Sequence, residues 1–189
     1  MKVFHLFLIA ISLVVSCGAM SQPGAPLKEV NNFVINNGVV TWSNVYNFSL
    51  EEMNSIHEWF YSNFNVSREN EKSIIAETYK NVLPINEVGL DRMSVVMILT
   101  HPCVVYFTTE FKEDRYRVTI NRVIWYPQVA VTTYNVTQGV GAMDLNDLAL
   151  KKGNTFRSSF CKSISEHLNR IFTYMFTYHK VHEEQNDDW

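Results

Sequence analysis

Residues 103–126 read CVVYFTTEFKEDRYRVTINRVIWY, and this stretch decides the fold class. Apolar and polar residues alternate on both sides of a charged centre, which predicts two strands joined by a tight turn at residues 110–115. We therefore expect a half-buried antiparallel sheet with one polar side. The expected inward positions are Val105, Phe107, Thr109, Phe111, Tyr116, Val118 and Ile120, and the expected outward positions are Arg115, Arg117, Thr119 and Asn121.

A hairpin and two helices are predicted around these strands. Asn36, Asn37 and Gly38 form a turn signal inside a hairpin over residues 32–48. Ser49 and Glu52 have the spacing of a capping box, which starts an amphipathic helix over residues 49–63. A long helix is expected from residue 155 to about residue 178, because apolar residues recur there at three- and four-residue spacing. Further strands are expected at residues 72–80 and 95–99, and loops at residues 67–72, 82–93 and 128–153, the last with a short turn at residues 145–150.

These elements predict one α+β domain over residues 32–180. Its sheet is expected to be curved and antiparallel, with about five strands and both helices packed on one face. The acidic residues 181–189 are expected to form a disordered tail.

The N-terminus resembles an export signal. Lys2 precedes an apolar run over residues 3–15 that is too short to span a bilayer and ends in small residues. Two cleavages remain open. In one, residues 1–16 are removed at a lipobox, Cys17 is acylated and anchors the protein to a membrane, and residues 17–31 form a tether. In the other, residues 1–21 are removed after Ser21, and Gln22 begins a protein without the lipid anchor. Both predict an exported protein, located in the cell envelope or secreted.

Composition argues against nucleic acid as a partner. The 189 residues carry a formal net charge of −3 and no basic cluster, whereas nucleic-acid binding depends on phosphate contacts from lysine and arginine. No pattern in the chain predicts a cofactor.

Arg115 and Arg117 are the candidate ligand-binding residues. They lie two apart on the polar face of a predicted strand, so their guanidinium groups project side by side and suit a carboxylate, a phosphate or an anionic glycan. The alternative is cross-strand pairing with Glu110 or Glu113.

The cysteines and histidines give weaker candidates. His101 and Cys103 would share a strand face, but Pro102 lies between them and no third group orients a catalytic pair. Cys103 and Cys161 could form a disulfide in an exported protein or remain buried thiols, and the sequence leaves both open.

Metal-binding patterns are equally incomplete. His179 and His182 have a possible zinc spacing near a helix end but lack a third ligand. Asp144 and Asp147 do not match a calcium loop, because the central glycine and terminal glutamate are missing. We predict no catalytic residue and no metal ligand.

The strand pair also carries a family resemblance. The run 110–120, EFKEDRYRVTI, resembles the strand signature of uncharacterised exported proteins and lipoproteins of Bacteroidetes. Residues 38–45, GVVTWSNV, and 150–153, LKKG, followed by Phe156 and Phe160, fit the same group, although Asp114 stands where glycine is commoner. Some of its members are domains of unknown function with a TATA-binding-protein-like fold, which the resemblance implies here.

No enzyme activity follows from the resemblance. We expect a non-enzymatic cell-envelope protein that binds a protein partner or an anionic ligand. The alternatives are a structural subunit of an envelope assembly and, less well supported, a hydrolase that uses His101 or the loop of Asp144 and Asp147.

Overall fold

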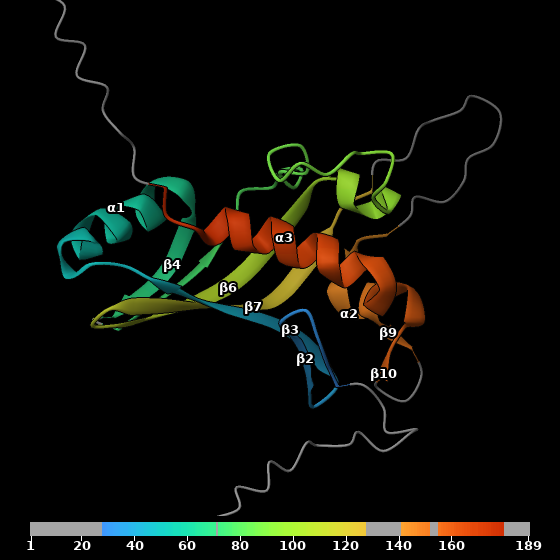
Figure 1. Ribbon diagram of the computed structural model, residues 1–189, viewed down its shortest axis with the longest axis horizontal. Helices are drawn as coiled ribbons and strands as arrows, with labels where there is room; N and C mark the ends of the chain where they lie inside the picture. The colour runs from blue at the N-terminus through green and yellow to red at the C-terminus, as the bar shows by residue number, and fades with distance from the viewer. Residues whose placement is uncertain (1–27, 71, 128–140, 152–154, 180–189) are drawn as a thin grey trace, which may run out of the picture.

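The computed structural model describes residues 28–70, 72–127, 141–151 and 155–179, which form an antiparallel sheet and three α-helices (Figure 1). The class is α+β, as predicted. The sheet strands are β1 (Glu29–Val30), β2 (Phe33–Asn36), β3 (Val39–Asn47), β4 (Asn65–Asn70), β5 (Ser73–Glu77), β6 (Cys103–Lys112), β7 (Arg115–Trp125) and β8 (Met143–Asp144). The α-helices are α1 (Met53–Asn63), α2 (Leu145–Ala149) and α3 (Ser165–Phe176), with 3-10 turns at Leu50–Glu52 and Met97–Thr100 and a π-helical turn at Phe160–Ile164.

The sheet has eight strands, so the expectation of about five was wrong. Its order is β1-β2-β3-β7-β6-β5-β4, and β8 pairs with one end of β7. The strand β4 was predicted as a loop, and the two-residue strands β1 and β8 are too short to leave a pattern in the sequence. A separate small ribbon joins β9 (Leu150–Lys151) to β10 (Thr155–Phe156).

The predicted hairpin at residues 32–48 is confirmed. Asn37 and Gly38 both have positive φ, 50° and 78°, as a two-residue turn between twisted strands requires. This turn sets the register in which Phe33 pairs with Trp42, so both aromatic side chains lie on the same, buried face.

The predicted strand pair at residues 103–126 is also confirmed. The strands β6 and β7 pair in the register Lys112 with Arg115 and Glu110 with Arg117, leaving Glu113 and Asp114 as the turn. The expected inward side chains are all buried, while Arg115 and Arg117 are exposed on the other face.

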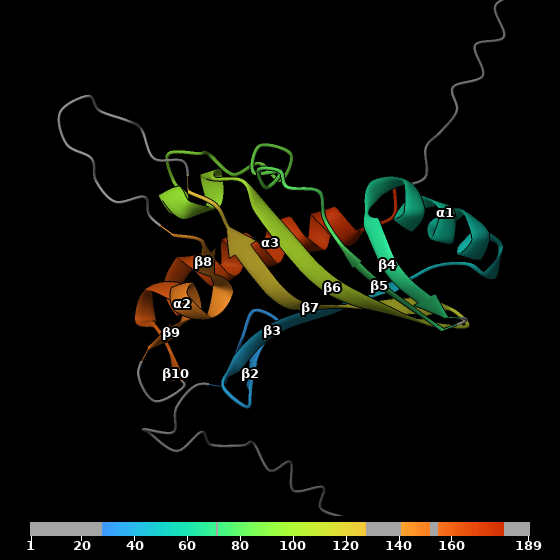
Figure 2. The same ribbon diagram turned by 180° about the vertical axis from the view of Figure 1, so that it is seen from behind.

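The core lies between the sheet and two helices. Figure 1 shows α3 crossing one face of the sheet, and Figure 2 shows the other face of β3, β7 and β6 with no described helix across it. Four apolar side chains of α3 are fully buried: Leu168, Ile171, Phe172 and Phe176. Helix α1 adds Ile56 and Phe60, and its predicted capping box forms, since Glu52 Oε2 accepts hydrogen bonds from the backbone N–H and the hydroxyl of Ser49.

Two predicted elements differ from the structure. The apolar residues 95–99, expected as a strand, lead into the 3-10 turn Met97–Thr100 instead. The C-terminal helix does not begin at Thr155, because Thr155 and Phe156 pair with β9; helical structure begins at Ser158 and α3 ends at Phe176. The predicted signal, its two cleavage points, Cys17, the tether up to residue 27, most of the 128–153 loop and the acidic tail lie outside the described residues.

Candidate functional site

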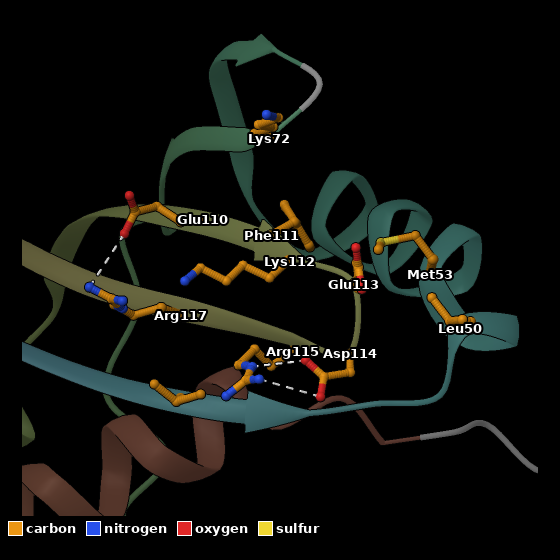
Figure 3. A pocket seen from close by; sticks show the side chains of 11 residues that line it. Leu50, Met53, Lys72, Glu110, Phe111, Lys112, Glu113, Asp114, Arg115 and Arg117 are labelled. Carbon is orange, nitrogen blue, oxygen red and sulfur yellow. Dashed lines mark hydrogen bonds and ion pairs between the residues drawn. The ribbon is translucent and has the colours of Figure 1, made fainter.

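The open face of the sheet carries a groove at the closed end of the β6–β7 hairpin (Figure 3). The groove has a volume of about 900 Å³. Both arginines named from the sequence line it. The lining residues are Val45, Leu50, Met53, Lys72, Glu110, Phe111, Lys112, Glu113, Asp114, Arg115 and Arg117.

Strand geometry places the two arginines side by side. Arg115 and Arg117 are two residues apart on β7, so their side chains leave the same face of the sheet. Lys112 of β6 is the cross-strand partner of Arg115 and adds a third cation on this face. In Figure 3 the side chains of Lys112 and Arg117 project from neighbouring strands to the same side.

Both arginines are already paired with carboxylates. Arg115 Nε lies 2.8 Å from Asp114 Oδ1, and Arg117 Nη1 lies 3.8 Å from Glu110 Oε2. The cross-strand pairing with Glu110 is therefore present, whereas the turn carboxylate that pairs with Arg115 is Asp114 and not Glu113. All four side chains are more than half exposed, so water screens these pairs and each contributes little, about 0–1 kcal/mol. An incoming anion can replace these carboxylates at low cost.

Lys72 and Lys112 were missed by the sequence analysis. No carboxylate of the described chain lies within ion-pair distance of either ammonium group. Lys72 reaches the groove because its carbonyl oxygen accepts a hydrogen bond of 2.8 Å from the N–H of Phe111, which fixes it beside β6. For Lys112 a signal existed, since it continues the outward alternation of the predicted strand; for Lys72 there was none, because the β4–β5 hairpin was not predicted.

Apolar side chains also line the groove. Leu50 is 70% exposed, Val45 is 49% exposed, and Met53 is half-buried. The groove therefore combines cationic groups with an apolar rim, which suits a ligand that carries both an anionic group and carbon surface.

The weak candidate pair of His101 and Cys103 is not organised for catalysis. Cys103 is buried in β6, and desolvation by burial raises the pKa of its thiol to about 12. The nucleophilic thiolate is therefore almost absent at neutral pH. Cys103 and Cys161 are both free thiols, so the possible disulfide does not form.

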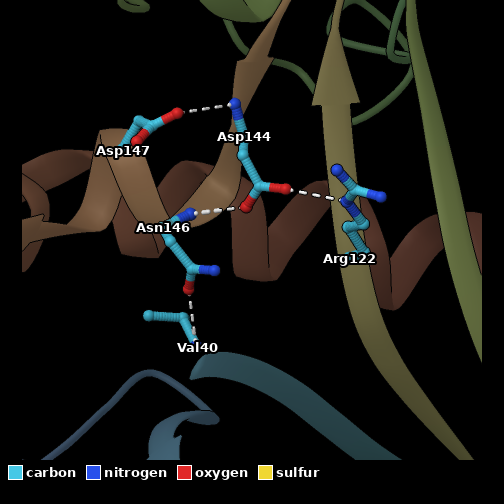
Figure 4. A network of polar contacts seen from close by, with 5 residues as sticks. All are labelled: Val40, Arg122, Asp144, Asn146 and Asp147. Carbon is cyan, nitrogen blue, oxygen red and sulfur yellow. Dashed lines mark hydrogen bonds and ion pairs between the residues drawn. The ribbon is translucent and has the colours of Figure 1, made fainter. Parts of the chain in front are cut away.

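The loop of Asp144 and Asp147 has a structural role (Figure 4). Asp144 Oδ1 accepts a hydrogen bond of 3.0 Å from the N–H of Asn146, which caps α2, while its Oδ2 lies 2.9 Å from Arg122 Nε. Asp147 Oδ2 accepts from the N–H of Asp144, and Asn146 Oδ1 accepts from the N–H of Val40. These contacts join α2 to β3 and β7 and leave no open carboxylate pair.

No metal centre is present among the described residues. They contain no group of three histidine, cysteine or acidic side chains positioned to hold an ion. His179 packs its ring 5.4 Å from that of Tyr174, and His182 lies outside the described residues.

Two aromatic side chains of the last helix, Phe172 and Phe176, belong to the core. Phe172 lies against Phe33 and Trp42, and Phe176 lies against Phe64 and Phe107, with ring centroids 4.7–6.2 Å apart. The sheet and the end of α1 therefore cover this face of α3.

Neither a membrane-spanning helix among the described residues nor a known relative points to a function. Within the described ranges no helix has the length and apolar character needed to cross a bilayer. No protein-family model matches the chain, and no curated protein and no solved structure is significantly similar to it. The groove at the closed end of the β6–β7 hairpin, the hairpin groove, is therefore the candidate functional site.

Proposed function

We propose that this chain is an exported, non-enzymatic protein of the cell envelope that binds an anionic group in the hairpin groove. The observation that carries the proposal is that four cationic side chains, Arg115, Arg117, Lys112 and Lys72, line one groove together with exposed apolar side chains. Arginine side chains can bind a carboxylate or phosphate through two parallel hydrogen bonds, and the lysines add point charges without a carboxylate partner among the described residues.

The geometry favours binding over chemistry. The groove contains no histidine and no cysteine, and its three carboxylates are exposed on the hairpin. Two of these carboxylates, Glu110 and Asp114, are engaged with Arg117 and Arg115, so neither is oriented as a general base towards the groove. Part of the proposal is the implied membership of the exported Bacteroidetes group with a TATA-binding-protein-like fold, which rests on the strand signature of β6 and β7.

A titration with inorganic tripolyphosphate tests the binding site. Tripolyphosphate is a compact polyanion, and its binding is followed by calorimetry and by amide chemical shifts in the isotope-labelled protein. We expect the double variant Arg115→Gln, Arg117→Gln to bind at least tenfold more weakly than the wild type. Arg92→Gln is the matched control, because Arg92 is exposed in the loop before Met97–Thr100 and does not line the groove. Equal affinities of the three proteins, or shifts that map away from the groove, refute the proposal.

The intact mass of the mature protein tests the proposed export and anchoring. A mass that begins at Cys17 with added acyl chains, in the membrane fraction, supports the lipid anchor. A mass that begins at Gln22, in the soluble fraction, replaces the anchored form with a secreted or periplasmic one. An uncleaved chain contradicts export.

A further inference from the structure

The two arginines of the hairpin groove are held by their carboxylates to different degrees. Asp114 accepts hydrogen bonds from Arg115 through both carboxylate oxygens, at 2.8 Å from Nε and 3.5 Å from Nη2. Arg117 meets Glu110 at a single distance of 3.8 Å between Nη1 and Oε2, which is longer than a hydrogen bond. A ligand can therefore engage Arg117 with a smaller loss of existing contacts than Arg115.

Strand pairing places a second cation and an apolar side chain beside Arg117. Lys112 is the cross-strand partner of Arg115, so it lies diagonally from Arg117 on the same face of the sheet. Diagonal neighbours lie about 7–8 Å apart, within reach of long side chains, and Figure 3 shows Lys112 extending towards Arg117. On its other side Arg117 pairs with Val45 of β3, which is 49% exposed. We call Arg117, Lys112 and Val45 the Arg117 subsite.

The charge of the groove suits one small anion. Four cations and three carboxylates line it, so the surplus is a single positive charge. Nucleic acids and anionic membrane surfaces are bound through clusters of lysine and arginine with a much larger surplus. The groove therefore fits a single anionic group better than an extended polyanion.

Glu110 makes the Arg117 subsite selective among small anions. It is held opposite Arg117 by strand pairing, so it competes with any ligand at an effective concentration on the order of mM or more. A monocarboxylate that displaces Glu110 replaces one carboxylate with another and gains no charge. A phosphate monoester carries a charge of about −1.5 to −2 and three acceptor oxygens, so it can bind Arg117 and Lys112 at once.

We propose that the Arg117 subsite binds a soluble phosphate monoester. Its phosphate group contacts Arg117 and Lys112, and its carbon part lies on Val45. Glu110 excludes monocarboxylates as a tethered competitor, while Arg115 stays with Asp114 and does not contact the ligand. This inference rests on the proposed function, because it names the ligand class of the same groove.

Three small ligands test the selectivity of the wild-type chain. Phenyl phosphate and benzoate share a ring and differ in the anionic group, and inorganic phosphate lacks the ring. By calorimetry we expect phenyl phosphate to bind at least about tenfold more tightly than benzoate, because it makes a further charge-assisted contact. Equal affinities for these two ligands overturn the inference.

Methyl signals locate the carbon part of the ligand. The ring of phenyl phosphate should shift the methyl signals of Val45, whereas inorganic phosphate should shift mainly the amide signals of Arg117 and Lys112. If phenyl phosphate leaves the Val45 methyl signals in place, the assignment of the carbon part to Val45 is overturned.

Two single variants test the role of Glu110. Glu110→Gln and Glu113→Gln each remove one negative charge from the groove, but within the described ranges Glu113 forms no ion pair with a groove cation. We expect Glu110→Gln to raise the affinity for benzoate about 3- to 10-fold, because more of the subsite is open, and Glu113→Gln to change it less than about twofold. Equal gains assign the effect to net charge and overturn the competitor role of Glu110.

Two double variants that keep the net charge identify the arginine that binds. We expect Glu110→Gln with Arg117→Gln to weaken phenyl phosphate binding about tenfold, since a bidentate contact is lost. Asp114→Asn with Arg115→Gln is the matched control and should change the affinity less than about twofold. All four side chains are more than half exposed, so both proteins should keep the fold, which circular dichroism checks. A larger loss for the second pair overturns the assignment to Arg117.

Tripolyphosphate separates this inference from the proposed function. If tripolyphosphate binds in the groove while phenyl phosphate binds no better than benzoate, the inference fails and the proposed function stands. If none of these anions shifts the groove signals, both fail.

Discussion

Replacement of Tyr116 by phenylalanine is the sharpest test of how the C-terminal helix is attached. The hydroxyl of Tyr116 donates to the Phe176 carbonyl at 2.7 Å and accepts from the Tyr178 N–H at 3.2 Å, and its side chain is fully buried. Removal leaves a buried carbonyl without this donor and a half-buried N–H without its acceptor. A buried unsatisfied group costs about 1–3 kcal/mol, so we expect a loss of about 2 kcal/mol in the free energy of unfolding.

Tyr46 provides the matched control for this measurement. Its ring stacks on that of Tyr116 with centroids 4.9 Å apart, but its hydroxyl lies 3.3 Å and 3.5 Å from the carbonyls of Thr173 and Phe172. These long contacts contribute less, so Tyr46→Phe should cost under about 1 kcal/mol.

Urea denaturation followed by circular dichroism measures both changes, and thermal unfolding should show a fall of about 4–8 °C for Tyr116→Phe. If the two variants agree within about 0.5 kcal/mol, the paired hydrogen bonds of Tyr116 do not hold the end of α3, and the reasoning fails.

Three further outcomes follow from the contacts of single side chains. Asp144→Ala should lower the free energy of unfolding by about 1 kcal/mol through loss of the cap on Asn146, whereas Asp144→Asn should retain most of it; equal losses would contradict the capping role. Cys103 should resist iodoacetamide at pH 8 in the folded protein while half-buried Cys161 reacts, and peptide mass mapping that finds both labelled at the same rate would argue against the burial of Cys103. Burial raises the pKa of Cys103 to about 12 from 9.0, so the stability that it contributes is complete below pH 9 and is lost as pH rises towards 12, since the unfolded thiol releases its proton first. Urea titrations between pH 8.5 and 10.5 should therefore show a steeper loss for the wild type than for Cys103→Ala, and parallel losses would exclude this linkage.

The strands β6 and β7 were predictable because one face of the pair lies on the core and the other faces water. In residues 105–112 of β6 and 115–121 of β7, every second side chain is buried and the others are exposed or half-buried, so the period of two is visible in the sequence. Strand β4 gives no such signal. Its residues NVSREN are exposed except for half-buried Val66, so an edge strand without a buried face has the composition of a loop. The strand predicted at residues 95–99 was wrong for a different reason. These residues are apolar throughout, and a run this short has no period that distinguishes a strand from a helical turn.

The candidate site was predictable only in part. The alternation of β7 brought Arg115 and Arg117 to one face, and this needed only local strand geometry. The approach of Lys72 depends on the pairing of β5 with β6, and that of Leu50 and Met53 on how the start of α1 lies against the hairpin. Such long-range relations are fixed by packing across the whole domain and leave no spacing in the sequence.

Helix α3 follows the strands that it covers in the sequence, and this order has a consequence for biosynthesis. Phe33, Trp42 and Phe107 lie in strands that are complete long before Phe172 and Phe176 are added, yet these last two rings cover them. A nascent chain whose α3 has not yet left the ribosome therefore presents a broad aromatic surface to its surroundings. Stable folding of the sheet must wait until α3 has been synthesised and can cover these rings.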